Sequence, residues 1–371
     1  MIISNRCNSA LSLRRVPLLD LHRSLGASIG EFAGYQTAIS YESVIDEHLS
    51  VRREAGIFDI SHMTMILLSG QGWLEVIDRL VPKKLDKLRK GSILGPTVFL
   101  NEEAGIKDDV LVYPLLSGDY LVVGNAVNLA KDLEWLEQYS PPGSKVTLLN
   151  TEHSLLALQG PRSPELVKDL VPQAQELGRM SFLENVETSL GTIRLVSRSG
   201  WTGEDGFEFL AKNNVAERLF MYFVNRGVKP CGLAARDTLR LEMGFLLYGQ
   251  DMNEDTSPIE ARYWIVFDQD KKNCVGCEAL HKKLREGARE VRVGLKLKKG
   301  ERTIPRTGAR VTLLGEVIGR VTSGGYSPLL ERPIAIAYLK PSHALMGLSV
   351  TVEVRGKQLE AKIVDFPFIN K

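Results

Sequence analysis

Acidic side chains stand among apolar residues at two places in the sequence, where they could meet a ligand. Residues 101–115, NEEAGIKDDVLVYPL, place Asp108 and Asp109 against an apolar run that is typical of a strand. Side chains alternate along a strand, so Asp109 shares a face with Leu111 and Tyr113, and Asp108 points the other way. A carboxylate beside a tyrosine could meet a flat ligand that forms hydrogen bonds. The alternative is that Asp109 caps a turn and points to water.

Another acid, Glu208, and two arginines follow later in the chain. Glu208 lies between two phenylalanines in FEFL and points to the opposite face of the predicted strand, where it is either solvated or hydrogen-bonded. The segment CGLAARDTLRLEMGFLLYGQDM predicts a helix over residues 233–244, with Arg236 and Arg240 one turn apart. Salt bridging, with Asp237 near Arg240, is the alternative role for these arginines.

Several well-known motifs are missing from the sequence. It contains no phosphate-binding P-loop, no HExxH pair and no GxSxG elbow, and the glycines of GWTGEDG lack the dinucleotide-binding spacing. Six histidines are scattered along the chain. ATP chemistry, hydride transfer, zinc hydrolysis and acyl transfer by a triad are therefore disfavoured, and we expect no metal.

Length and composition predict a globular protein with several domains. The chain has 371 residues, enough for two or three domains, with 44% hydrophobic and 25% charged residues. A net charge of +2 disfavours a nucleic-acid partner. The sequence contains no run of eighteen apolar residues, so we expect no membrane-spanning helix.

Cysteines and the N-terminal segment bear on the compartment. Four cysteines in a chain of this length favour a reducing compartment, and Cys274 and Cys277 form one CxxC. A redox pair or half a metal site is possible there, but two incidental thiols are favoured. The first 25 residues carry arginines and serines and no acid before Asp20, like a mitochondrial transit peptide. The favoured alternative is a ragged arm, so we expect a cytoplasmic protein, with the mitochondrial matrix as the alternative.

Hydrophobic periodicity predicts the main elements. Residues 44–60 predict a helix that ends near Gly56 and then a strand, while residues 72–88 and 129–140 predict amphipathic helices. Residues 191–212 predict two strands joined by a glycine-rich turn. After about residue 290, alternating strands with glycine turns predict a separate all-β domain of about 80 residues, a sandwich or a barrel.

Seven motifs carry a family resemblance: IFDISHM, NEEAGIKDDVLVY, ALQGP, GWTGEDGFE, CGLAARDTLRLEMGFLLYGQDM, VGCEAL and VTSGGYSP. Their order and spacing resemble those of the glycine cleavage system T protein family of aminomethyltransferases, over about residues 17–368. The stretch GPTVFLNEEAGIKDDV resembles archaeal members more than mitochondrial ones.

The resemblance implies an α+β fold with three domains in a cloverleaf around a central folate channel. Domain 1 would comprise residues 17–60 and 150–255, domain 2 residues 61–149 and 256–288, and domain 3, an all-β barrel or jelly roll, residues 289–371. The implied reaction moves the methylene group of an aminomethyl-lipoyl H protein to tetrahydrofolate, or to the modified pterin of some archaea, and releases ammonia.

The resemblance also implies roles for individual residues. Asp109 matches the critical aspartate of the family, which would position and polarise the attacking amine and steady a cationic iminium. Glu208 matches the glutamate that binds the pterin through parallel hydrogen bonds. Further ligand contacts are implied for Arg236, Asn125, Tyr113, Trp201 and, near the channel mouth, Arg306. Asp108 would be structural, as a turn or cap residue.

Three departures from the family pattern concern the ligand site. Pro96 stands where an aromatic residue is frequent, Cys277 stands where Lys or Arg is usual, and the aromatic tail of mitochondrial members is missing. Two other functions stay open. One is a folate-dependent demethylase of a small methylated amine or sulfonium. The other is a non-enzymatic folate-binding relative that maintains iron–sulfur proteins, which is disfavoured because KKNCVGCEAL lacks the tyrosine and glutamine of that group's motif.

Overall fold

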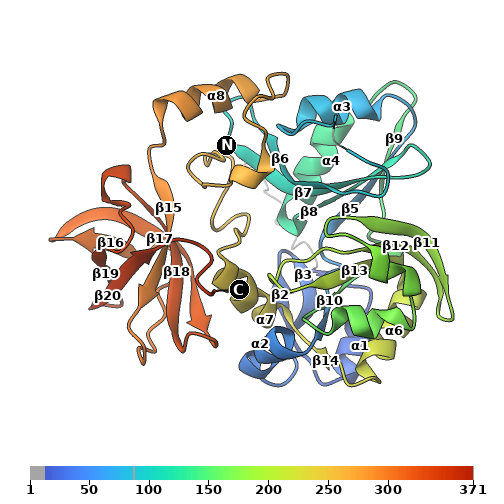
Figure 1. The fold of residues 1–371 in the computed structure, drawn as a ribbon, viewed down its shortest axis with the longest axis horizontal. Coiled ribbons are helices and arrows are strands. Elements are labelled where there is room, and N and C mark those ends of the chain that lie inside the picture. Colours follow the sequence, from blue (N-terminus) through green and yellow to red (C-terminus); the bar gives the residue numbers. More distant parts are fainter. Residues whose placement is uncertain (1–12, 87, 371) are drawn as a thin grey trace, which may run out of the picture.

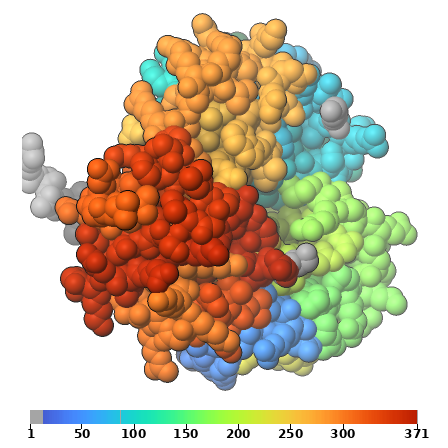
Figure 2. All heavy atoms as spheres, turned by 60° about the vertical axis from the view of Figure 1, so that its left-hand side comes forward, coloured from blue at the N-terminus to red at the C-terminus, as the bar shows by residue number. Residues whose placement is uncertain are grey.

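Three lobes meet in the middle of the protein in the computed structural model, which describes residues 13–86 and 88–370 (Figure 1). The C-terminal barrel forms one lobe, and the other two combine β-sheets with helices. The space-filling view shows the barrel as a body of its own, packed against the other two lobes (Figure 2). The α+β cloverleaf implied by the resemblance is confirmed, whereas the domain boundaries given above stay a prediction.

The first lobe is built on a six-stranded sheet and a small three-stranded sheet. The strands of the large sheet are β4 (Gly56–Asp59), β10 (His153–Gln159), β11 (Phe182–Thr188), β12 (Gly191–Ser197), β13 (Gly206–Lys212) and β14 (Lys229–Pro230). They run in the order β11-β12-β13-β10-β4-β14. The small sheet consists of β1 (Arg14–Arg15), β2 (Ser28–Phe32) and β3 (Tyr35–Ser40). The helices are α1 (Leu19–Ser24), α2 (Val44–Arg53), α5 (Ser163–Lys168), η2 (Pro172–Glu176), α6 (Asn213–Val224) and α7 (Leu233–Met243).

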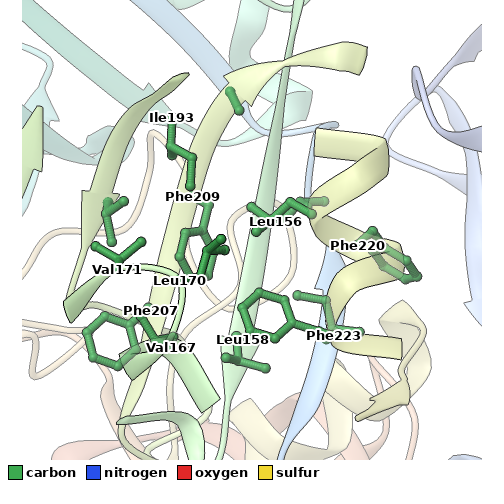
Figure 3. Close-up of a cluster of buried hydrophobic side chains, with 14 of the residues drawn as sticks. Leu156, Leu158, Val167, Leu170, Val171, Ile193, Phe207, Phe209, Phe220 and Phe223 are labelled. Carbon is green, nitrogen blue, oxygen red and sulfur yellow. The ribbon is translucent and has the colours of Figure 1, made fainter. Parts of the chain in front are cut away.

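Strand β13 shows why Glu208 points away from the core of this lobe. Phe207 and Phe209 are fully buried and pack with Phe220 and Phe223 of α6 on one face of the sheet (Figure 3). Because side chains alternate along a strand, Glu208 must face the other way. The apolar contacts fix the register of β13, and the register fixes the direction of the carboxylate.

The second lobe is a five-stranded sheet with helices against it. Its strands are β5 (Thr64–Ser69), β6 (Leu94–Leu100), β7 (Ile106–Pro114), β8 (Tyr120–Gly124) and β9 (Lys145–Leu148). They run in the order β6-β7-β8-β5-β9. The helices are α3 (Trp73–Leu80), η1 (Ala126–Asn128), α4 (Leu129–Gln138), η3 (Trp264–Val266) and α8 (Cys277–Glu286). Helix α3 ends earlier than its apolar pattern predicts, because Val81 precedes Pro82 and a residue before proline avoids helical backbone.

The third lobe is a closed six-stranded barrel, as the glycine-punctuated strands predict. Its strands are β15 (Val291–Leu297), β16 (Arg310–Leu313), β17 (Glu316–Ser327), β18 (Arg332–Leu339), β19 (Ser349–Val354) and β20 (Lys357–Val364), with η4 (Pro341–His343) between β18 and β19. They close in the order β15-β18-β17-β16-β19-β20. Alternate residues of β15, namely Val293, Leu295 and Leu297, fill the barrel interior. Within residues 13–86 and 88–370, no helix is long and apolar enough to cross a membrane.

Helix α7 is anchored between the first lobe and the barrel. Glu242 near its end accepts a hydrogen bond from Arg52 of α2 at 2.9 Å and another from Ser327 of the barrel at 2.5 Å. Gly244 follows the helix with φ +70°, and a Cβ there would lie 2.1 Å from the Phe366 ring, so only glycine fits. These contacts hold the helix that carries Arg236.

Two sequence interpretations need correction. Cys274 and Cys277 form a disulfide instead of two incidental thiols. Gly276 takes a left-handed φ of +74° and brings their Cα atoms to 5.1 Å, which is close enough for a bridge. The second correction concerns the N-terminal segment: Arg14 and Arg15 pair with β3 and residues 19–24 form α1, so this part is folded. The rest of the expected arm, residues 1–12, lies outside the described residues.

Candidate functional site

A cavity of about 620 Å³ is lined by residues of the first and second lobes. Five of the residues that the resemblance implies line it: Asp109, Asn125, Trp201, Glu208 and Arg236. They come from β7, the β8–η1 junction, the β12–β13 turn, β13 and α7. The cavity therefore brings together side chains that are far apart in the sequence.

Tyr113 and Arg306 are placed differently from what the resemblance implies. Tyr113 shares a face of β7 with Asp109, but the residue is only 3% exposed. Its ring packs edge-on against Phe182, with 5.4 Å between the ring centroids, in the core instead of in the cavity wall. Arg306 is exposed on the loop between β15 and β16 and is not among the residues that line the cavity. Apolar burial thus takes Tyr113 out of direct contact with the cavity.

At one end of the cavity, Asp109 is held by two side-chain hydrogen bonds. Asn125 donates to its Oδ1 at 2.6 Å, and the hydroxyl of Tyr263 donates to its Oδ2 at 3.3 Å. Strand alternation turns Asp109 towards the cavity with Leu111, as the sequence predicts, so the pair does not cap a turn.

The pKa of Asp109 lies close to neutral pH. Burial raises it most, the neighbouring charge of Asp108 raises it further, and the two hydrogen bonds partly oppose this, which leaves the pKa at about 7. A carboxyl group with this pKa can hold or release a proton at physiological pH. The chemistry available at this end is therefore proton transfer and stabilisation of positive charge.

Asp108 is structural, but it lies inside β7 and is neither a turn nor a cap residue. It is fully buried and accepts hydrogen bonds from the backbone N–H of Asn125 at 2.9 Å, its Nδ2 at 2.7 Å and Nδ2 of Asn128 at 2.5 Å. A buried carboxylate needs such donors, because it has lost its hydration. Asp108 thereby fastens the start of η1 to the strand that carries Asp109.

Glu208 lies at the other end of the cavity and is only partly engaged. Its charge acts on Tyr113, which is four residues, about 13 Å, further along β7 than Asp109. The Ser199 hydroxyl donates to Oε2 of Glu208 at 2.6 Å. The hydroxyl oxygens of Ser197 and Ser199 are 2.8 Å apart and form a hydrogen bond. Among the residues that the structure describes, no group donates to Oε1. Glu208 is 7% exposed, so its free oxygen is available mainly to a molecule in the cavity.

Arg236 and His62 border the same end and carry buried nitrogens that lack hydrogen-bond partners in the described part of the chain. These are Nη1 of Arg236 and Nδ1 of His62. Burial lowers the pKa of Arg236, while the charge of Glu208 raises it. Burial, and then the charge of Arg236, lower the pKa of His62 to about 4, so its ring is neutral at physiological pH. An unpartnered buried polar atom is costly, and a ligand would satisfy it.

Between the two ends, the cavity wall is largely apolar and suits a flat ring. Trp201 packs against Phe245 at 5.0 Å, which fixes the indole as part of the wall. Pro96 also lies in the wall, where the sequence departs from the family pattern. The main aliphatic contributors are Ile60, Met63, Leu111, Val123, Leu155, Met180 and Leu233.

Comparison with known proteins identifies the family. The GCVT N-terminal domain model matches residues 18–271, and the model of the glycine cleavage T-protein C-terminal barrel domain matches residues 291–370. The chain belongs to the glycine cleavage T-protein family.

The similarity to individual members of the T-protein family extends over nearly the whole chain. A probable aminomethyltransferase of Aeropyrum pernix is 43% identical, over 97% of this chain and 98% of the relative. An aminomethyltransferase of Thermus thermophilus is 40% identical, over 96% and 99%. The crystal structure of glycine cleavage system aminomethyltransferase T from Bartonella henselae has a TM-score of 0.89 at 35% identity and covers 96% of this chain and 98% of that one.

In this T-protein family member, sequence reasoning missed three residues of the site. His62 belongs to the motif ISHM, but a lone histidine gives no signal by itself. Ser199 follows β12, and only the paired register of β12 and β13 brings it to Glu208. Tyr263 lies 154 residues from Asp109 in the sequence, so only the tertiary fold could reveal their contact.

Proposed function

We propose that the chain is an aminomethyltransferase of the glycine cleavage system. It transfers the methylene group of an aminomethyl-lipoyl arm to tetrahydrofolate and releases ammonia. The observation that carries this proposal is one cavity with a hydrogen-bonding cluster at each end: Glu208, Arg236 and His62 at one, Asp109 and Asn125 at the other. We call these the binding end and the reaction end.

The binding end is complementary to the edge of a pterin ring. The pyrimidinone edge carries two adjacent N–H donors and, next to them, a carbonyl acceptor. A carboxylate accepts parallel N–H hydrogen bonds, and Glu208 has a free Oε1 for this purpose. Arg236 has an unpartnered donor beside Glu208, which suits the carbonyl oxygen. The apolar walls would then cover the faces of the ring.

The reaction end suits methylene transfer without any redox step. The carbon of the aminomethyl group leaves both its sulfur and its amine nitrogen and forms bonds to two nitrogens of the folate. Each folate nitrogen gives up one proton, so that one proton completes ammonia and the other completes the thiol of the lipoyl arm. Asp109 carries protons between these groups, and its ionised form stabilises the cationic iminium that appears when ammonia leaves.

The partner that brings the one-carbon group is the lipoylated H protein. A lipoyl arm is long and flexible enough to reach into a cavity from a protein docked outside. The pterin is tetrahydrofolate or the modified pterin of archaea. The archaeal alternative has support in the 43% identity to the Aeropyrum pernix protein and in Pro96, which replaces one aromatic wall.

The test is ammonia release from H protein loaded with the aminomethyl group. We expect release to require both the loaded H protein and the pterin, and methylenetetrahydrofolate to form in equal amount. The control replaces the loaded H protein by small methylated amines. Turnover of such a free amine, with no response to H protein, would overturn the proposal in favour of a demethylase.

A further inference from the structure

A third carboxyl group lies behind Asp108 and Asp109, and the reaction described so far does not use it. Asp132 is in the first turn of α4 and is 1% exposed, while Asp108 is 0% exposed. Both approach the backbone of β8: a Cβ at Gly124 would lie 2.6 Å from Oδ2 of Asp108 and 3.2 Å from Oδ2 of Asp132. The two buried acids are thus neighbours.

The surrounding donors serve Asp108 and leave Asp132 without any. The three N–H hydrogen bonds from Asn125 and Asn128 end on Asp108. Among the described residues, no group donates to either oxygen of Asp132. A buried, ionised carboxylate without a donor would be strongly unfavourable, the more so beside a second negative charge. A protonated Asp132 would avoid this cost, and its hydroxyl could then donate to the neighbouring Asp108.

Asn125 connects this pair of acids to the cavity. Its Nδ2 lies 2.7 Å from Oδ1 of Asp108 and 2.6 Å from Oδ1 of Asp109, so each aspartate receives one of its two protons. The orientation of the amide thus depends on Asp108, and the orientation of the Asp109 carboxylate depends on the amide. Hydrogen bonds thus run from Asp108 through Asn125 to Asp109, and Asp132 lies beside Asp108.

We propose that Asp132 is a positioning residue for methylene transfer: as a protonated acid it completes the hydrogen bonds of Asp108, which stays ionised and orients Asp109 through Asn125. This inference rests on the proposed function. Of the two buried acids behind the cavity, Asp108 carries the negative charge. Asp132 stabilises that charge by donating a hydrogen bond to it.

The lysines near Asp132 do not replace the hydrogen bonds that it lacks, because they are paired with another acid. The charges of Lys131 and Lys107 act on Asp132, and both lysines pair with Glu254, at 3.0 and 3.6 Å. Glu254 therefore offsets the two lysines. Tyr248 accepts a hydrogen bond from Lys131 at 2.7 Å.

On the cavity side, Tyr263 faces Asp109, and the charge of Arg292 acts on Tyr263. Burial and Asp108 together raise the pKa of Asp132 well above its usual range, and burial raises that of Asp108.

The test compares two substitutions of similar size. In Asp132→Asn, an amide N–H replaces the donated proton, so we expect most of the turnover rate and the pH profile to be retained. In Asp132→Leu, Asp108 loses a donor and is protonated more easily, so it repels the Asp109 charge less. We expect kcat to fall about tenfold, KM for the pterin to stay within about twofold, and the acidic limb of the kcat profile to move to lower pH by about one unit.

Glu134→Leu is the matched control, because Glu134 is exposed on the same helix. An unchanged rate and pH profile in Asp132→Leu would overturn the inference, as would an equal loss in Asp132→Asn.

If Asp132→Leu fails to fold, infrared spectroscopy of the wild type at pH 8 decides instead. The carbonyl band of a protonated carboxyl should be present and should vanish in Asp132→Asn, and absence of the band would contradict the inference. If the wild type transfers no methylene group but shows this band, the proposed function fails and the protonation of Asp132 stands.

Discussion

The two ends of the cavity treat their polar atoms in opposite ways. At the reaction end, the Asn125 amide, Asp108 and Asp109 are joined by hydrogen bonds of 2.6 to 2.9 Å. At the binding end, Nη1 of Arg236 and Nδ1 of His62 lack partners within the described residues. The first arrangement fixes a reacting group before any ligand arrives, and the second keeps hydrogen bonds available for the ligand.

This difference has an energetic meaning. A buried polar atom without a partner costs about 1–3 kcal/mol, so the binding end reduces the stability of the empty protein. A ligand that supplies the missing partners recovers this free energy as affinity. At the reaction end both side-chain oxygens of Asp109 already have partners, which hold the carboxyl group in place and reduce the reorganisation needed during the reaction. Substitutions at the two ends should therefore change different quantities.

The largest effect is expected for Asp109→Asn. The amide cannot accept a proton or offer a negative charge, so turnover should fall about a hundredfold or more, while the pterin Kd stays within a few-fold. Steady-state ammonia release and equilibrium pterin binding measure the two quantities. Asp255→Asn, an exposed aspartate outside the cavity wall, is the control. Unchanged turnover in Asp109→Asn would remove Asp109 from the mechanism.

Glu208→Gln should show the opposite pattern. It replaces a charged acceptor by a neutral one and places an N–H donor against the ligand, so the pterin Kd should rise by about ten- to a hundredfold. Once pterin is saturating, the single-turnover rate should change much less. A variant that binds normally but reacts slowly would place Glu208 in the chemistry and break the contrast between the two ends.

The pH dependence of turnover tests the role of the Asp109 carboxylate at the reaction end. With a pKa of about 7 for Asp109, turnover that needs the carboxylate should rise with pH and level off above about pH 8, and at pH 6 it should be about tenfold below the plateau. Pterin binding should show no such step from Asp109. The Asp109→Asn variant should lose the midpoint near pH 7, and a wild-type profile that is flat between pH 6 and 8 would contradict the assignment.

The same raised pKa predicts a change in stability with pH. Between about pH 4 and pH 7 the folded protein keeps a proton on Asp109 that the unfolded chain has already released. The free energy of unfolding contributed by this group is therefore largest below pH 4 and is lost as the pH rises through 7. Urea unfolding of the wild type and Asp109→Asn across this range isolates the contribution, since Asn cannot titrate. Equal slopes in both proteins would rule it out.

The smallest effect is expected for His62→Leu. The unpartnered Nδ1 is lost, so the empty protein should gain about 1 kcal/mol in free energy of unfolding, while pterin binding weakens about fivefold. His153→Leu is a matched control, because Nδ1 of His153 is also buried and has no partner among residues 13–86 and 88–370, but His153 lies outside the cavity wall. It should gain stability with unchanged binding. Weaker binding in both variants would show that the effect is not specific to the cavity.

The sequence predicts those parts of the site that depend on local periodicity. Alternation along β7 and β13 gives the directions of Asp109 and Glu208, and the helical pattern gives the position of Arg236 on α7. The burial of Tyr113 could not be predicted, because it depends on Phe182 of another sheet.

Contacts between distant elements were likewise invisible in the sequence. The role of Asp132 depends on α4 lying behind β7, and the engagement of Asp109 depends on Tyr263. The disulfide depends on the left-handed backbone of Gly276, for which the sequence offers only the glycine itself.

The most direct test of the account is a structure of the protein with bound tetrahydrofolate. We predict that the pyrimidinone N–H groups lie within hydrogen-bond distance of Glu208, that Arg236 donates to the carbonyl oxygen, and that the two nitrogens to be bridged face Asp109. A ring bound in the reverse orientation, or outside this cavity, would contradict the division into a binding end and a reaction end.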